Sequence, residues 1–378
     1  MNENNMLIPE PLRKGDRIAI VSLSNGILGE PYCAHTLKAG TDRLRSFGLE
    51  PVFMENTLKG SEYLLAHPEA RAADLKAAFL DDSINGIITA IGGIETFRTF
   101  PYLMEDEEFI SAVKSHPKLF LGFSDTTHNH FMLRRLGLQT YYGQAFMCDI
   151  AELSGDMLPY SKAQFESCFA PYHGRKITPS EIWYDDRTDF SPAAFGTMPV
   201  SHREEHGYEL LQGSSVFEGE LLGGCIDSMG EMLLAGNMER LGDLILPYCG
   251  LVPGLADDFR NQSEIVCRYN IFPGAEEWRG KIFFAETSEV APTPDVLRLY
   301  LEAFTAEGIF ANVNGIIVGK PINEKYYEEY KQVWREVVND ESLPILYNVN
   351  FGHAAPRAIL PYGAMARADA EKQEIVLL

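Results

Sequence analysis

Basic residues are scarce in this chain of 378 residues, in which 32 lysines and arginines face 54 aspartates and glutamates, a formal net charge of −22. Proteins that bind nucleic acids or anionic membrane surfaces need a basic patch to do so. We therefore expect neither of these as a partner. The charge is compatible with an enzyme that acts on small molecules.

Long apolar segments are missing as well. The sequence holds no run of about 18 apolar residues, the length that a membrane-spanning helix needs. Residues 1–5 carry neither the basic stretch nor the apolar core of a secretion signal. The sequence therefore predicts a cytoplasmic protein without a membrane span.

Cysteine is also infrequent. The six cysteines are scattered, and no two of them have the C-x-x-C spacing. This pattern argues against a disulfide framework and against a cysteine-based zinc site, and we expect reduced, mostly buried thiols. Apolar residues, in contrast, make up 46% of the chain, so a large folded core is expected.

Apolar, β-branched runs alternate with helical patterns over the first 172 residues. Strands are predicted at 17–22, 50–53, 86–91 and 119–122, and helices at 34–47, 68–80 and 126–136. This alternation predicts a flavodoxin-like α/β domain, with a parallel sheet covered by helices. The ends of three strands, at Ser22, Gly92-Gly93 and Ser124, would then share the edge at which such sheets bind ligands.

The pattern is lost between residues 173 and 215, which are dense in proline, glycine, histidine and aspartate. We interpret this segment as a linker with a loop that covers a cleft. Alternation resumes in a second α/β domain at 216–378. Its predicted strands lie at 218–224, 281–285, 313–318, 344–349 and 375–378, and its predicted helices at 225–234, 294–304 and 324–338.

The strand predicted at 119–122 runs directly into the helix predicted at 126–136, and Ser124 lies at the turn between them. A serine at such a corner is the geometry of a nucleophile elbow, and the next residue, Asp125, would offer its backbone N–H to an oxyanion. The usual G-x-S-x-G pattern has glycine where this chain has Thr126. The alternative interpretation is an ordinary helix N-cap at Ser124 or Asp125.

Two later strand ends carry the partners that a serine nucleophile needs, a histidine as base and a carboxylate that orients the histidine. Glu286 follows the strand predicted at 281–285, and His353 follows the one at 344–349. The order Ser, Glu, His along the chain matches one known order of such triads. Alternatively, Glu286 is a surface carboxylate and His353 a structural histidine.

Other patterns point to different classes of protein. His202-Arg-Glu-Glu-His206 matches the zinc motif H-x-x-E-H, but the stretch lacks the apolar stripe of a helix and we interpret it as a solvated loop. His128 and His130 diverge on a helix, so we expect them to be cap or packing residues. Two α/β domains with a cleft are also compatible with a small-molecule binding protein that has no catalytic activity.

Five motifs occur in order along the chain: Ile-Gly-Gly-Ile at 91–94, Gly-Phe-Ser-Asp at 122–125, Gly-Glu-Leu-Leu-Gly-Gly at 219–224, Phe-Ala-Glu-Thr at 284–287 and Asn-Phe-Gly-His at 350–353. Together they resemble the LD-carboxypeptidase family of serine peptidases, which includes muramoyltetrapeptide carboxypeptidases and microcin C immunity peptidases. The resemblance implies an active site between two α/β domains, a homodimer, and no metal or cofactor.

The resemblance also implies roles for individual residues. Ser124 would be the nucleophile, His353 the general base and Glu286 its orienting acid. The backbone N–H groups of Gly93 and Asp125 would form the oxyanion hole. The implied reaction is hydrolysis of an amide bond next to a free carboxylate, through an acyl-enzyme.

The substrate stays open between a murein tetrapeptide and an aminoacyl-nucleotide. Trp183 is similar to a tryptophan of the microcin-immunity branch that stacks on a nucleobase, although a tryptophan there could also anchor the loop. Cys225 stands where the family often has asparagine, and residues 287–290, Thr-Ser-Glu-Val, replace a lysine-bearing sequence. Both departures concern the choice of substrate.

Overall fold

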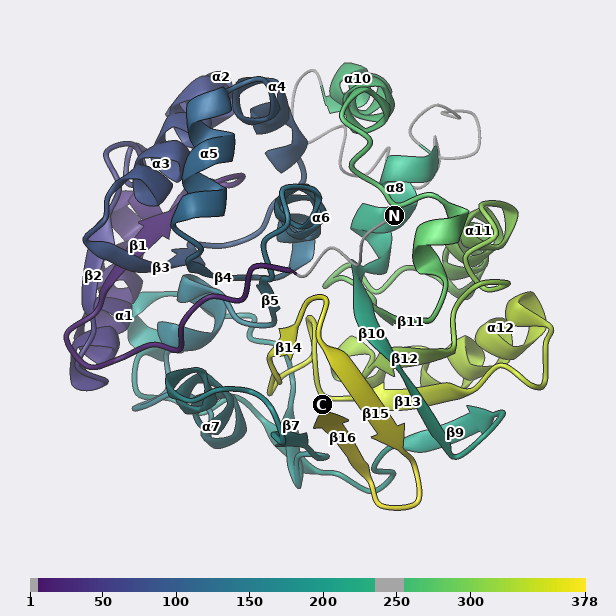
Figure 1. Cartoon of the computed structure of the whole chain (residues 1–378). Coiled ribbons are helices and arrows are strands. Elements are labelled where there is room, and N and C mark those ends of the chain that lie inside the picture. The colour runs from purple at the N-terminus through teal and green to yellow at the C-terminus, as the bar shows by residue number, and fades with distance from the viewer. Residues whose placement is uncertain (1–5, 235–254) are drawn as a thin grey trace.

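The computed structural model describes residues 6–234 and 255–378, which form two large sheets placed side by side, each with its own helices (Figure 1). The predicted class, α/β with parallel strands in both sheets, is confirmed. The strands and helices predicted at 17–136 and 218–378 begin and end within about three residues of the observed ones.

The first sheet has the strand order β14-β5-β4-β3-β1-β2, which contains the flavodoxin-like order 2-1-3-4-5. Its five N-terminal strands are parallel, and β14 joins them in the antiparallel direction. The strands are β1 (Arg17–Val21), β2 (Glu50–Phe53), β3 (Ile84–Thr89), β4 (Leu119–Gly122), β5 (Tyr141–Tyr142) and β14 (Leu360–Pro361).

Helices cover both faces of this sheet, with α3 and α5 on one side and α1 and α7 on the other (Figure 1). Local signals start them: α3 has Pro68 at its first position, and the side chain of Asp106 caps α5 by accepting a hydrogen bond from the Phe109 N–H at 2.9 Å. The helices are α1 (Ala34–Ser46), α2 (Ser61–Ala66), α3 (Pro68–Leu80), α4 (Phe100–Met104), α5 (Glu107–Ser115), α6 (Thr127–Arg135) and α7 (Pro159–Glu166).

The second sheet has the order β6-β16-β15-β10-β11-β12-β13-β9, with a parallel centre and antiparallel strands at both sides. Its strands are β6 (Lys176–Ile177), β9 (Glu209–Gln212), β10 (Val216–Cys225), β11 (Lys281–Glu286), β12 (Gly315–Gly319), β13 (Ile345–Val349), β15 (Met365–Asp369) and β16 (Glu374–Leu377). Its helices are α8 (Ile226–Leu234), α10 (Leu255–Arg268), α11 (Pro294–Ala306) and α12 (Tyr327–Val338).

The segment 173–215, in which the sequence pattern predicts no strand, contains four strands. Two of them, β6 and β9, form the outer edges of the second sheet, while β7 (Ile182–Tyr184) and β8 (Ser201–Arg203) pair with each other. Strands of two to four residues are too short for an alternating pattern to show in the sequence. The domain boundaries at 172 and 216 stay a prediction.

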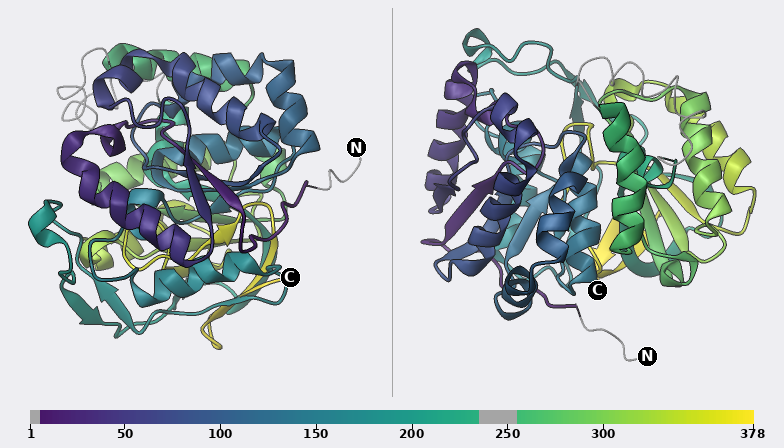
Figure 2. Two further views of the ribbon diagram at one scale, coloured as in Figure 1. Left: turned by 90° about the vertical axis from the view of Figure 1, so that its left-hand side faces the viewer. Right: turned by 90° about the horizontal axis from the view of Figure 1, so that it is seen from above.

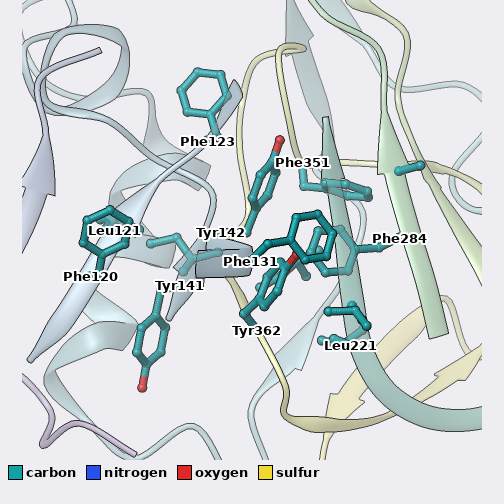
Figure 3. Packing of buried hydrophobic residues seen from close by; sticks show 14 of the residues in the cluster. Phe120, Leu121, Phe123, Phe131, Tyr141, Tyr142, Leu221, Phe284, Phe351 and Tyr362 are labelled. Carbon is teal, nitrogen blue, oxygen red and sulfur yellow. The ribbon is translucent and has the colours of Figure 1, made fainter. Parts of the chain in front are cut away.

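One continuous cluster of buried apolar side chains extends through both sheets. Aromatic rings join the two halves: Tyr142 packs on Phe284 at 5.4 Å between ring centres, and Tyr362 packs on Phe131 at 5.6 Å and on Phe284 at 5.6 Å (Figure 3). Seen from above, the two sheets lie side by side (Figure 2, right). The halves are therefore held by a buried, aromatic contact.

Five of the six cysteines, at positions 33, 148, 168, 225 and 267, are free thiols, and three of the five are buried. The predicted thiol at Cys249 lies outside the described residues. Within the described parts of the chain, no helix combines the length and apolar character needed to cross a bilayer.

Candidate active site

Ser124 lies at the turn between β4 and α6, as the sequence predicts. Its backbone is in the left-handed region with φ of 64°, a conformation that costs energy for any residue other than glycine and that is common at functional turns. A short 3-10 turn, Ser124–Thr126, then leads into α6, and none of the cap positions of these two elements is hydrogen-bonded by a side chain. The N-cap alternative is therefore not what the structure shows.

The structure brings Ser124, His353 and Glu286 together from distant parts of the chain. His353 Nε2 lies 3.0 Å from Ser124 Oγ, and His353 Nδ1 lies 2.8 Å from Glu286 Oε2. The backbone N–H of His353 also donates to Glu286 Oε2 at 3.1 Å. Glu286 and His353 are 1% and 7% exposed, so Glu286 is not the surface carboxylate considered as an alternative.

Glu286 is held from two further sides. Tyr142 Oη donates to Glu286 Oε1 at 2.5 Å, and the backbone N–H of Ser124 donates to Tyr142 Oη at 3.3 Å. Gly352, with φ of 87°, lies so close that a Cβ there would collide with the Glu286 side chain. No sequence pattern points to Tyr142, which connects the turn of Ser124 with the carboxylate of Glu286.

The Gly92-Gly93 turn lies against Ser124. A Cβ placed on Gly92 would lie 2.9 Å from Ser124 Oγ and 3.4 Å from the backbone N of Asp125, and Gly93 has φ of 152°. The Asp125 side chain accepts from the Thr96 N–H at 2.9 Å and lies 3.0 Å from His128 Nδ1. Burial alone would raise the pKa of Asp125, but these partners hold it below its usual value.

A second carboxylate faces the candidate base. Glu289 Oε2 lies 3.0 Å from His353 Nε2, the same nitrogen that faces Ser124. Burial alone would lower the pKa of His353, but the charges of Glu286 and Glu289 and their hydrogen bonds raise it to about 10. Glu289 belongs to the 287–290 stretch that departs from the family pattern, and the sequence analysis gave it no role of its own.

Trp183 lies in strand β7 rather than in an irregular loop, and it is 8% exposed, so its ring is buried. Its ring stacks on His202 with 4.1 Å between centres, and Lys320 Nζ lies 4.9 Å from its centre. The backbone N–H of Tyr184 donates to Ala355 O at 3.0 Å, which places β7 beside the loop of His353. Whether Trp183 contacts substrate stays a prediction.

A cavity of about 260 Å³ opens beside Trp183. Its lining is largely polar and includes charges of both signs. The lining residues are Trp183, His202, Arg203, Glu205, His206 and Glu324. A second cavity, of about 150 Å³, lies beside Gly93 and Glu95 and therefore next to the turn of Ser124.

The histidines of the H-x-x-E-H stretch do not share a helical face, because residues 201–203 form strand β8. His202 Nε2 lies 2.9 Å from Asp185 Oδ1, and His206 stacks on Tyr327 with 4.8 Å between ring centres. His128 and His130 are buried packing residues, as predicted, and the ring nitrogens of His130 lie 2.7 Å from Thr140 Oγ1 and 3.0 Å from Gly122 O.

Among the described residues, the group that comes nearest to a set of metal ligands is Cys225, Glu286 and His353, whose ligand atoms lie within 4.8 Å of one another. Two of its members already bond to each other, and Cys225 Sγ lies 3.8 Å from Asp227 Oδ2. We interpret these side chains as parts of the hydrogen-bonded network around His353.

Sequence models of the LD-carboxypeptidase N-terminal and C-terminal domains match residues 18–143 and 218–368. The chain belongs to the LD-carboxypeptidase family, as its motifs predict, and is a hydrolase of the carboxypeptidase class. The elbow, Glu286 and His353 all lie within the matched ranges.

Relatives of the chain include proteins of the microcin-immunity type. The crystal structure of an MccF-like protein from Streptococcus pneumoniae in complex with AMP is 43% identical, covers 96% of this chain and 98% of its own, and has a TM-score of 0.87. An MccF-like protein from Bacillus anthracis is 23% identical, with 98% and 99% covered and a TM-score of 0.76. The microcin C7 self-immunity protein MccF of Escherichia coli is 22% identical, with 99% of this chain and 96% of the other covered.

Proposed function

We propose that the protein is a serine-type carboxypeptidase in which Ser124, His353 and Glu286 form the catalytic triad. The observation that carries this proposal is the continuous chain of contacts from Ser124 Oγ through both ring nitrogens of His353 to Glu286. A hydroxyl becomes a nucleophile when a positioned base can take its proton, and the base is fixed when a carboxylate binds its other nitrogen.

The proposed reaction passes through an acyl-enzyme. Ser124 Oγ attacks the carbonyl carbon while its proton passes to His353 Nε2, and the N–H groups of Gly93 and Asp125 stabilise the oxyanion. His353 then gives the proton to the leaving nitrogen, and the C–N bond breaks. Water, deprotonated by His353, releases the acyl group as a carboxylate and restores Ser124.

The proposed substrate is an aminoacyl-nucleotide, with the amide bond next to the free carboxylate or phosphate group as the site of cleavage. The Streptococcus pneumoniae relative was solved in complex with AMP. The cavity beside Trp183 has a volume of about 260 Å³ and lies along the strand that contacts the His353 loop. The base of the nucleotide would bind in this cavity against Trp183.

We also propose a cytoplasmic homodimer, in line with the resemblance. Light scattering on the purified protein would give its mass in solution, and a monomer would contradict the proposal.

Replacing the nucleophile tests the catalytic assignment. Ser124→Ala should lower kcat by about a thousandfold or more, because only binding and oxyanion stabilisation remain. The double variant with His353→Ala should be little worse than either single variant, since triad residues act as one unit. Circular dichroism and thermal melting would verify that the fold is kept.

Several results would contradict the proposal. Wild-type kcat in Ser124→Ala would remove Ser124 as nucleophile and favour a different mechanism. Losses that multiply in the double variant would leave His353 with a structural role. A side-by-side assay on an aminoacyl-nucleotide and a murein tetrapeptide decides the substrate, and faster cleavage of the tetrapeptide would overturn the nucleotide assignment.

A further inference from the structure

Glu289 makes a contact that the proposed reaction does not use. Its Oε2 lies 3.0 Å from His353 Nε2, and Ser124 Oγ lies 3.0 Å from the same nitrogen. A general base needs a free lone pair on Nε2 to take the serine proton. The carboxylate of Glu289 therefore competes with the nucleophile for the base.

The contacts of His353 fix its protonation. An ionised carboxylate can only accept hydrogen bonds. Since Nδ1 faces Glu286 and Nε2 faces Glu289, both ring nitrogens carry a proton, and the ring is an imidazolium ion. The raised pKa of His353, about 10, agrees with this state. An imidazolium has no lone pair with which to accept the proton of Ser124.

The other groups around the ring do not remove this conflict. Arg357 packs nearby, but its guanidinium donates to the backbone O of His353 and pairs with Asp149 at 3.0 Å. Asp186 and Asp227 add negative charge, which acts on His353 in the same direction as Glu289. Uncharged neighbours of the ring include Ser124, the thiol of Cys225, whose sulfur lies within 4.8 Å of a ring nitrogen, and the ring of Phe123, 5.0 Å between centres.

The Glu289 side chain is open to solvent, although the backbone beside it is tied down. The neighbouring Ser288 N–H donates to Asp227 Oδ2 at 2.9 Å, which ties the loop to α8. The Glu289 side chain is nevertheless 61% exposed, whereas that of His353 is 7% exposed. A carboxylate that is open to solvent and touches a buried base can exchange that base for another cation.

We propose that Glu289 is a specificity residue that selects substrates with a positive charge, such as a free α-ammonium group, on the acyl side of the cleaved amide. This inference rests on the proposed function and deepens it. The substrate ammonium pairs with the Glu289 carboxylate and draws it from His353. The Nε2 proton then passes to water, and the neutral ring accepts the hydrogen bond of Ser124 Oγ–H. Without that cation the base stays protonated.

The test compares one aminoacyl adenosine phosphoramidate that has a free α-amine with its N-acetylated form. The wild type should cleave the free amine with a kcat/KM at least about tenfold higher, because a charge-assisted pair is lost in the acetylated form. Glu289→Gln should bring the two values within about threefold of each other. Glu108→Gln is the matched control, since Glu108 is a similarly exposed, 66%, ion-paired glutamate on α5.

The pH profile separates selection from a merely structural role. The negative charge of Glu289 raises the pKa of His353, so its removal lowers that pKa and makes the base available at lower pH. The acid limb of kcat/KM for the acetylated substrate should therefore move down by about one pH unit or more in Glu289→Gln. The limb should stay in place in Glu108→Gln.

An unchanged substrate ratio in Glu289→Gln, or an acid limb that does not move, would overturn the inference while leaving the triad intact. If Ser124→Ala keeps its activity, or if the wild type cleaves neither substrate, the proposed function fails first and the inference fails with it. A uniform loss on both substrates with an unmoved limb would assign Glu289 to the structure of the loop alone.

Discussion

At the scale of single residues, glycines allow chain segments to pack closely against the proposed catalytic side chains. The glycines around the site are places where chain segments touch without a side chain between them. Gly92 lies against Ser124, and Gly352 lies against Glu286. Because both contacts are with proposed catalytic side chains, any added Cβ would displace the reacting atoms.

Gly92→Ala should lower kcat by about a hundredfold, because the new Cβ would lie 2.8 Å from Ser124 Cβ and a shift of about 1 Å at a nucleophile costs roughly that much. The measurement is kcat with a saturating substrate, together with the thermal midpoint. Gly155→Ala is the control, since a Cβ at Gly155 meets nothing within 4 Å. A kcat within threefold of the wild type for Gly92→Ala would show that the Gly92-Gly93 turn can accommodate the Cβ without displacing Ser124.

The sequence was sufficient to predict some of these residues and not others. Ser124, Glu286 and His353 could be found because each directly follows an apolar run at a strand end. Tyr142 and Glu289 could not, because their importance comes from contacts between segments that are distant in the sequence. Tyr142 reaches Glu286 across 144 positions, and no local pattern in the sequence reports such a contact.

At the scale of elements, the long strands and helices followed the sequence patterns, while the short strands of 173–215 did not. An alternating pattern needs four or more residues to be distinguished from chance, and β7 and β8 have three each. The small sheet nevertheless supports the site from outside, since Tyr184 in β7 bridges to Ala355, two residues after His353.

Trp183→Ala tests what the β7 element does. Removing a buried ring should lower the thermal midpoint, by a destabilisation of about 3 kcal/mol or more. If Trp183 also stacks on a base, kcat/KM for a nucleotide-bearing substrate should fall by a further 5- to 150-fold or so, relative to a peptide without an aromatic group. Comparison of the two substrates removes the effect of lost folding, which acts equally on both. An equal loss on both would leave Trp183 as an anchor.

At the scale of the whole molecule, the proposed triad spans the seam between the two sheets. Ser124 comes from the first sheet, and Glu286 and His353 from the second. The aromatic packing of Tyr142, Phe284 and Tyr362 fixes the distance between the halves (Figure 3). The site therefore depends on the seam as much as on its own side chains.

Tyr142→Phe removes the hydroxyl that links the halves while keeping the ring in the seam. Glu286 Oε1 loses a buried donor, so the free energy of unfolding should fall by about 1–3 kcal/mol. The value of kcat should fall as well, because the carboxylate that orients His353 is held less firmly. Tyr172→Phe is the control, since its hydroxyl bonds to Gln139 at 3.2 Å within the first half. Tyr172→Phe should lose stability but keep its kcat. Equal kcat values in the two variants would contradict a role of the Tyr142–Glu286 hydrogen bond in catalysis.

The last strand of the first sheet is synthesised long after the other strands of that sheet. β14 (Leu360–Pro361) pairs with β5, next to the turn of Ser124, and it follows His353 by only a few residues. During synthesis, more than two hundred residues are therefore added after Ser124 before His353 and β14 leave the ribosome. During that time the proposed general base of Ser124 has not yet been made. In the proposed mechanism the protein is therefore inactive until residue 353 has been made, and fragments that end before residue 353 stay inactive.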